Sequence, residues 1–164
     1  MSNIIIREAS VNDAAQIHHF ITELAIYEKA EHEVIASVDD IKRSIFGEES
    51  TVSALICEKE DKGSVEAIGF AVYFYNYSTW LGKNGLYLED LYVSPGYRGL
   101  GAGKALLKQL AKIAVSKGCG RFEWSVLDWN TPSIEFYESI GAKPKSEWIG
   151  YQLAGDTLVD FSQS

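Results

Sequence analysis

A strand, a short turn, a basic glycine-rich loop and the start of a helix follow one another in residues 86–104, LYLEDLYVSPGYRGLGAGK. Three glycines, Gly99, Gly101 and Gly103, alternate along the loop directly after Arg98. Glycine permits a positive φ and a close approach of a ligand to the main chain. A helix that begins here would present unpaired N–H groups and the positive end of its dipole. The stretch predicts a phosphate or pyrophosphate site, although the glycines could also serve only the turn.

The two best-known phosphate-binding loops do not match this stretch. A dinucleotide fingerprint, G-x-G-x-x-G, would need a third glycine where Lys104 stands. A P-loop, G-x-x-x-x-G-K-[ST], would need a glycine at Arg98 and a hydroxyl residue at Ala105. The pattern that remains is R-x-x-G-x-G, formed by Arg98, Gly101 and Gly103.

Length and charge limit the kind of protein. The 164 residues fit a single domain over residues 1–164 that is large enough to bury a core. The formal net charge of −8 disfavours nucleic acid as a partner and would attract a cationic small molecule. The chain has no apolar run of about 18 residues, and its start, MSNIIIREAS, does not resemble a signal peptide. We therefore expect a cytoplasmic protein that spans no membrane.

Cysteine and histidine spacing gives no indication of a metal site. Cys57 and Cys119 stand apart and are expected to be free thiols in a reducing compartment. His18, His19 and His32 occur early in the chain without a partner motif of metal ligands. We expect no bound metal.

The order of the expected elements predicts an α/β protein with a central mixed sheet and helices on both faces. The expected strands are rich in β-branched and aromatic residues, and they occupy residues 3–7, 51–58, 67–77, 86–93, 121–126 and 148–153. The expected helices have capping residues or apolar stripes, and they occupy residues 10–27, 37–47, 101–117 and 131–140. The two strands that flank the third helix should run parallel with a right-handed crossover.

Two adjacent carboxylates, Glu89 and Asp90, interrupt the apolar strand just before the glycine loop. Strand side chains alternate between faces, so only one carboxylate can point at a given site unless a bulge intervenes. In the functional interpretation, Glu89 faces a cleft and meets the ammonium group of a substrate, directly or through water. In the structural alternative, one carboxylate faces solvent and the other accepts a hydrogen bond.

Tyr137 is a third candidate for chemistry. It lies two turns into the helix that Thr131 caps and Pro132 begins, on one stripe with Ile134. Spacing alone favours core packing for this tyrosine, with its hydroxyl group hydrogen-bonded to a neighbour. Asn130, just before the helix, could equally be an ordinary turn residue.

Several motifs recur together over nearly the whole chain. They are IREAS near the start, LAIYEK at 24–29, YSTWLGK at 77–83, YLEDLYVSPGYRGLGAGK, and the series KGC…VLDWN…FY…GA. The R-x-x-G-x-G loop resembles the acetyl-CoA pyrophosphate loop of the GNAT superfamily of N-acetyltransferases. The full set of motifs is similar to the diamine (spermidine/spermine) acetyltransferase-like branch of that superfamily. The resemblance implies a GNAT acyl-CoA N-acyltransferase fold.

The resemblance also implies how acetyl-CoA is held. The cofactor would lie in a V-shaped opening between the strands at 86–93 and 121–126. Backbone groups of Leu91, Tyr92 and Val93 would hold the pantetheine arm and the acetyl carbonyl. The pyrophosphate would be bound by Arg98 and by main-chain N–H groups of Gly99, Leu100, Gly101, Ala102, Gly103 and Lys104. Asn130, Thr131 and Pro132 would border the cofactor further along.

The resemblance assigns the reacting groups as well. Tyr137 falls on the position of the family's general acid, which reverses the core-packing interpretation, and Glu89 is expected to accept the proton of the amine through water. The expected substrate-binding residues are Tyr27, Glu28, Trp80, Glu89, Asp90 and Trp148. Enzymes of this branch are homodimers, so a homodimer is expected.

One departure from the polyamine-specific enzymes concerns the substrate. Those enzymes carry Asp-Pro-Trp where this chain has Ser78, Thr79 and Trp80. The missing carboxylate removes one anchor for a distal ammonium group, which argues against tight polyamine binding without excluding it.

The expected function is acetyl-CoA-dependent acetylation of a primary amine on a small cationic substrate. Such a substrate is a thialysine- or lysine-like amino acid, a diamine or a polyamine, and it would react by direct attack in a ternary complex. A protein or peptide N-acetyltransferase would use the same loop but needs an open groove. A non-catalytic acyl-CoA-binding sensor would keep the loop and lose the acid.

Overall fold

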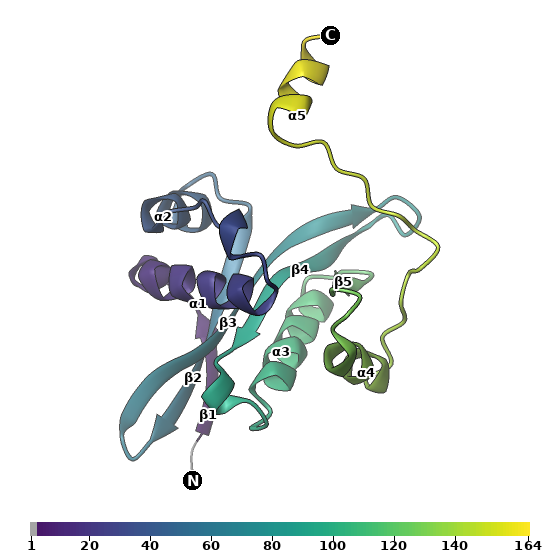
Figure 1. The fold of residues 1–164 in the computed structure, drawn as a ribbon. Coiled ribbons are helices and arrows are strands. Elements are labelled where there is room, and N and C mark those ends of the chain that lie inside the picture. The colour runs from purple at the N-terminus through teal and green to yellow at the C-terminus, as the bar shows by residue number, and fades with distance from the viewer. Residues whose placement is uncertain (1–2) are drawn as a thin grey trace. The chain divides into compact units, whose positions relative to one another are not determined.

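The computed structural model describes residues 3–164 and contains a five-stranded sheet in the order β1-β2-β3-β4-β5 (Figure 1). Neighbouring strands are antiparallel except for β4 and β5, which are parallel. The strands are β1 (Asn3–Glu8), β2 (Val52–Asp61), β3 (Ser64–Ser78), β4 (Lys83–Val93) and β5 (Phe122–Trp124). The parallel pair confirms the expected crossover through a helix.

Within residues 3–164, five α-helices and three short 3-10 turns accompany the sheet. The α-helices are α1 (Ala14–Tyr27), α2 (Val38–Phe46), α3 (Ala102–Ser116), α4 (Thr131–Ser139) and α5 (Gly155–Ser162). The 3-10 turns are η1 (Val11–Asp13), η2 (Glu31–Glu33) and η3 (Pro95–Tyr97). The chain divides into two compact units, Met1–Ser125 and Val126–Ser164, and each is described by itself. That residues 1–164 form one functional domain stays a prediction.

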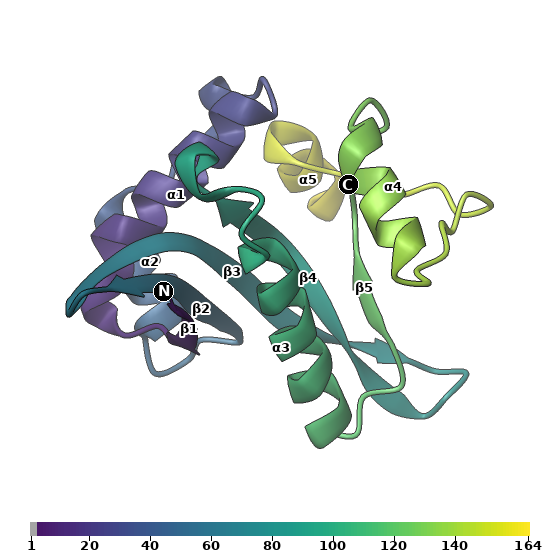
Figure 2. The ribbon, with the colours of Figure 1, turned by 90° about the horizontal axis from the view of Figure 1, so that it is seen from below.

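The helices of the first unit cover both faces of its sheet, which confirms the predicted fold class. On one face, the ring of Phe20 in α1 stacks on Phe70 of β3 with centroids 5.5 Å apart. The core on that face comes from α1, α2 and the central strands, and it consists of Ala14, Ile17, Phe20, Ile41, Ala54, Ile56, Phe70, Val72 and Tyr92. Helix α3 lies across the other face (Figure 2). Its apolar stripe is buried there through Ala102, Leu106, Leu107, Leu110 and Ala114.

The first hairpin is longer than predicted. Strands β2 and β3 extend into the polar residues between the predicted strands at 51–58 and 67–77, and only Lys62 and Gly63 connect them. Both residues have a positive φ, 51° and 82°. Two-residue hairpin loops favour such angles because their twist matches that of the strands.

The predicted strand at residues 148–153 is wrong. These residues adopt no regular structure, and the sheet formed by residues 3–164 has no sixth strand. Aromatic and β-branched residues favour a strand only where a neighbouring strand satisfies their backbone groups. Helix α5 (Gly155–Ser162), which was not predicted, follows this segment.

Two boundaries also differ from prediction. Strand β5 covers Phe122–Trp124 only, rather than residues 121–126, because its pairing with β4 extends over three residues. Helix α4 is capped by Asn130 rather than by Thr131, since the Asn130 side-chain oxygen accepts a hydrogen bond from the Ser133 N–H at 3.4 Å. Asn130 is therefore an N-cap, a role that asparagine side chains favour.

Candidate active site

The glycine loop is an open turn that leads into α3. Gly99 and Gly101 have φ values of +84° and +83°, angles that residues with a side chain rarely adopt. A Cβ atom at either position would have no heavy atom within 4 Å, so the main chain there can be approached closely. Gly99 and Gly101 thus have the conformational role that their spacing predicts, whereas Gly103 lies inside α3 without a positive φ.

The N-terminus of α3 keeps its first amide groups available. The first helical hydrogen bond runs from the Ala105 N–H to the Gly101 carbonyl at 2.9 Å. No side chain within residues 3–164 caps the helix at Gly101. Helix α3 has fifteen residues, so the N–H groups of its first turn and its dipole favour an anion at this end. The loop therefore fits a phosphate or pyrophosphate group.

The second half of β4 has a free edge on the side of β5. Parallel pairing ends at Leu88, which lies opposite Trp124 (Figure 2). The Tyr92 carbonyl oxygen lies beside Gly69 of β3, so its backbone faces that strand. Adjacent strand residues direct their backbone groups to opposite edges. Leu91 and Val93 therefore direct theirs to the unpaired edge.

A β-bulge changes the directions of the Glu89 and Asp90 side chains on β4. Val72 of β3 pairs with Asp90 and Tyr73 pairs with Leu88, so Glu89 is the extra residue between them. A bulge bends the strand locally and changes the direction of its side chains. The condition under which both carboxylates could contribute to one site is therefore met.

Asp90 lies on the α1 face of the sheet. Its cross-strand partner Val72 belongs to the core cluster on that face, as does Tyr92 two residues further on. The pKa of the Asp90 carboxyl is raised to about 6, mainly by burial and also by the neighbouring charges of Glu89 and Glu28. Asp90 is therefore ionised at neutral pH and titrates far above an ordinary aspartate.

Glu28 links this carboxylate to the end of α1. It caps the C-terminus of the helix directly after Tyr27, and burial raises the pKa of its carboxyl. The charge of Glu28 is close enough to raise the pKa of Asp90. Two residues predicted to bind substrate, from distant parts of the sequence, thus contribute negative charge to one place.

Arg98 joins the glycine loop to the same region. Its Nε donates a hydrogen bond to the Val93 carbonyl at 3.0 Å. Its guanidinium carbon lies 5.2 Å from the ring centroid of Tyr27 and 5.6 Å from that of Tyr92. Sequence reasoning treated Arg98 only as a phosphate-binding residue and missed these contacts, for which the sequence carries no local signal.

Three other predicted site residues belong to other elements of the chain. Trp80 is in the turn between β3 and β4, with 83 % of its surface exposed. In the second unit, Tyr137 is on α4 with its ring 5.9 Å from that of Phe136, and Trp148 is exposed in the irregular segment. The roles predicted for these three residues stay predictions.

Neither a metal cluster nor a membrane helix was found in the described part of the chain. No group of three His, Cys, Asp or Glu side chains within residues 3–164 is arranged to hold a metal ion. No helix in that range is long and apolar enough to cross a membrane.

A family model decides the classification. The model of the acetyltransferase (GNAT) family matches residues 14–142. The chain belongs to the GNAT family. The matched range includes β4, the glycine loop, α3 and α4, and GNAT acetyltransferases use acetyl-CoA.

The chain is also similar to individual proteins of known sequence or structure. The chain is 37 % identical to a thialysine N-epsilon-acetyltransferase of Sus scrofa, over 99 % of both chains. It is 37 % identical to a Homo sapiens spermidine/spermine N(1)-acetyltransferase-like protein 1, over 90 % of this chain and 22 % of that protein. A solved integron cassette protein from the V. cholerae metagenome is 27 % identical, with a TM-score of 0.80 over 98 % of both chains. This GNAT protein is therefore an N-acetyltransferase, and its relatives do not favour a non-catalytic sensor.

Proposed function

We propose that the enzyme transfers an acetyl group from acetyl-CoA to a primary amine of a small cation. The substrate class is a thialysine- or lysine-like amino acid, a diamine or a polyamine. One observation carries the proposal: an open glycine loop at the N-terminus of α3 and two carboxyl groups with raised pKa, Glu28 and Asp90, flank the same unpaired end of β4. The similarity to a thialysine N-epsilon-acetyltransferase and to a spermidine/spermine N(1)-acetyltransferase-like protein supports this substrate class.

The glycine loop and the free edge of β4 suit acetyl-CoA. The pyrophosphate would be bound by the amide groups from Gly99 to Lys104, which the open space around Gly99 and Gly101 leaves accessible. The pantetheine arm would lie along the backbone groups that Leu91 and Val93 direct to the unpaired edge. In the second unit, Asn130, Thr131 and Pro132 would border the cofactor.

The carboxylates attract the amine and make it reactive. An ε-amine has a pKa of about 10.4, so only about one molecule in a few thousand is neutral at pH 7. Glu28 and Asp90 would attract the ammonium group, with Tyr27, Trp80 and Trp148 lining its site. Glu89 would accept its proton through water, and partial desolvation would favour the neutral amine. The free amine is the nucleophile that the reaction needs.

The remaining steps use one backbone group and one side chain. Acetyl-CoA supplies a thioester, whose C–S bond breaks as the amine nitrogen forms the C–N bond. The Leu91 N–H would stabilise the negative charge that develops on the carbonyl oxygen. Tyr137 would donate its hydroxyl proton to the leaving thiolate. Cys57 is buried and its pKa is raised to about 11, which argues against an acyl-enzyme.

Release of the CoA thiol in a panel of acceptors tests the proposal. Thialysine, lysine, spermidine and a histone-type peptide are compared at equal concentration with saturating acetyl-CoA. The expected result is rapid thiol release with thialysine or another small amine and slow release with the peptide. A preference for the peptide would support a protein N-acetyltransferase, and no release with any amine would contradict the proposal.

Tyr137→Phe tests the assignment of the acid. The variant keeps the ring and removes the proton, so turnover should fall about 100-fold or more if Tyr137 is the acid. The kcat with the best amine of the panel is the measurement. Turnover within about threefold of the parent enzyme would show that another group protonates the thiolate.

The enzyme is also proposed to be a cytoplasmic homodimer. The resemblance to the diamine acetyltransferase-like branch supports this assembly, as do exposed apolar side chains of the second unit such as Tyr151 and Phe161. Light scattering after size-exclusion chromatography should give twice the chain mass. A mass equal to one chain at assay concentration would contradict the dimer.

A further inference from the structure

The guanidinium group of Arg98 lies between two aromatic rings that belong to different elements. One ring is that of Tyr27, the last residue of α1, and the other is that of Tyr92 on β4. Arg98 also donates a hydrogen bond to the Val93 carbonyl and directly precedes Gly99. One side chain therefore connects the glycine loop, the end of β4 and the end of α1.

The two rings differ in how firmly the core holds them. Tyr92 is 4 % exposed, and its ring centroid lies 6.0 Å from that of Phe20 within the core cluster. Tyr27 is 40 % exposed at the end of its helix. A cation is attracted to the face of each aromatic ring that it lies over. Arg98 therefore links the partly exposed Tyr27 to the buried side of the sheet.

The chain directly after Tyr27 carries the proposed amine-binding charge. Glu28 follows, and helix α1 ends there in a Schellman arrangement, with the Ala30 N–H bonded to the Ala25 carbonyl at 2.8 Å. Lys29 occupies the left-handed position of this cap, with a φ of 60°. A residue with a side chain adopts this angle at a cost, so surrounding contacts help to maintain the turn. The position of Glu28 depends on this turn.

We propose that Arg98 is a positioning residue that couples the acetyl-CoA loop to the amine site through Tyr27. It holds the end of α1 against β4, which keeps Glu28 near Asp90. Since Arg98 is covalently next to the loop, a ligand that orders the loop also orders this contact, and acetyl-CoA would thereby strengthen amine binding. The inference rests on the proposed function, and it adds a physical connection between the binding sites of acetyl-CoA and the amine.

A double-mutant cycle tests whether Arg98 acts through Tyr27. The substitutions are Arg98→Gln, which removes the cation, and Tyr27→Leu, which removes the ring. At saturating acetyl-CoA, Arg98→Gln should raise the amine KM roughly tenfold in the parent enzyme, a typical size for coupling between two sites. In the Tyr27→Leu background the same substitution should change the amine KM by less than about twofold.

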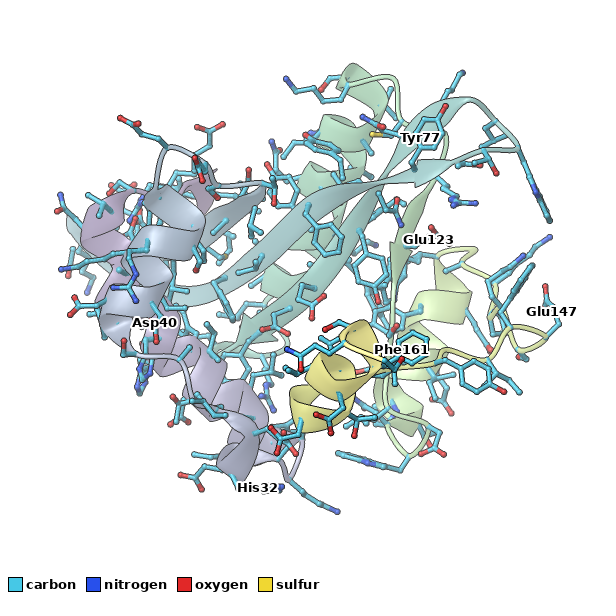
Figure 3. All side chains as sticks on the ribbon, turned by 90° about the horizontal axis from the view of Figure 1, so that it is seen from above. His32, Asp40, Tyr77, Glu123, Glu147 and Phe161 are labelled. Carbon is cyan, nitrogen blue, oxygen red and sulfur yellow. The ribbon has the colours of Figure 1, made fainter. Side chains whose placement is uncertain are left out.

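Two further variants provide controls. Tyr27→Phe keeps the ring, so Arg98→Gln should retain most of its effect in that background. Arg121→Gln is the matched arginine control, because Arg121 pairs with Glu123 of β5 at 3.0 Å and lies outside the proposed site. Glu123 is labelled in Figure 3. Its amine KM should equal that of the parent enzyme. An equal rise in this control would overturn the inference, since loss of any arginine would then have the same effect.

Calorimetry separates positioning from simple phosphate binding. Affinity for CoA is measured without amine in the parent enzyme and in Arg98→Gln. Coupling predicts that the amine KM changes by a larger factor than the CoA dissociation constant. Two results would overturn the inference. In one, Arg98→Gln changes the amine KM by the same factor in the parent enzyme and in Tyr27→Leu. In the other, it changes only the dissociation constant of CoA. Turnover by the parent enzyme establishes the proposed function independently, so additive effects in an active enzyme would reject only the coupling.

Discussion

Two groups of acidic side chains in the first unit have opposite surroundings. Asp13 and Glu58 both accept hydrogen bonds from Arg7, which lies 2.8 Å from Asp13 and 2.7 Å from Glu58. The hydrogen bond from Arg7 is the main reason that the pKa of Asp13 is below its usual value. These carboxylates connect β1, η1 and β2 through Arg7, whose single positive charge offsets part of their negative charge.

The carboxyl groups near the end of β4 have different electrostatic surroundings. Burial, Glu89 and Glu28 together raise the pKa of Asp90 to about 6, and no cation of the described chain is among the groups that affect it. Keeping a buried charge without a partner destabilises the folded protein. The comparison indicates that the Arg7 group stabilises the fold, whereas the Glu28–Asp90 group is suited to a cation supplied by the substrate.

Asp90→Asn should produce the largest effect within this comparison. Loss of its charge should lower kcat/KM for the amine about 100-fold, since a buried charge partner contributes several kcal/mol. The same variant should raise the free energy of unfolding at pH 7 by on the order of 2 kcal/mol, because the raised pKa makes the ionised form unfavourable in the fold. Steady-state kinetics and urea unfolding measure the two effects. A variant that loses both activity and stability would contradict the claim that the charge of Asp90 serves substrate binding and destabilises the fold.

The pH dependence of kcat/KM for the amine should report the ionisation of Asp90. Because its pKa is raised, Asp90 is charged above about pH 6 and neutral below, so attraction of the amine is present above this pH and lost below it. The profile of kcat/KM for the amine should therefore have an inflection near 6, with about a tenfold fall at pH 5. The inflection should disappear in Asp90→Asn. An unchanged inflection in the variant would assign it to another group.

Glu28→Gln should have a smaller effect on activity. Glu28 is only partly buried, so an amine KM increase of about fivefold is expected, with kcat nearly unchanged. The apparent pKa of the kinetic profile should fall as well, since Glu28 is one of the charges that raise the pKa of Asp90. A profile that keeps its inflection at the original pH would show that the two carboxylates are not coupled.

Asp13→Asn should leave activity unchanged and weaken folding. Its hydrogen bonds with Arg7 are partly exposed, so a loss of about 1 kcal/mol in the free energy of unfolding is expected at pH 7. The lowered pKa of Asp13 gives stability that is present above its ordinary value and lost as pH falls through the folded value. Unfolding at pH 7 and pH 3 should therefore differ less in the variant. A tenfold loss of kcat/KM would contradict a purely structural role.

Sequence predicted the features that local chemistry determines. Alternating glycines and an arginine indicated the loop at Gly99–Gly101, because only glycine readily adopts the positive φ found there. The apolar stripe predicted α3 because helical spacing is visible within a few turns. The family's full set of motifs, spread over nearly the whole chain, indicated acetyl-CoA chemistry.

Features that depend on distant partners could not be predicted. The segment at residues 148–153 has the composition of a strand, but nothing local shows whether a neighbouring strand exists. The bulge at Glu89 depends on the register of β3 against β4, and the contact of Arg98 with Tyr27 joins residues far apart in the chain. The raised pKa of Asp90 likewise arises from burial and from Glu28, which the sequence does not place beside it.

Calorimetric titration of thialysine into the enzyme saturated with CoA tests the central claim most directly. The account predicts binding at pH 8 that weakens about tenfold at pH 5 in the parent enzyme. In Asp90→Asn it predicts weak binding at both pH values, while Asp13→Asn binds as the parent does. Tight, pH-independent binding in Asp90→Asn would contradict the claim that this carboxylate group recognises the amine.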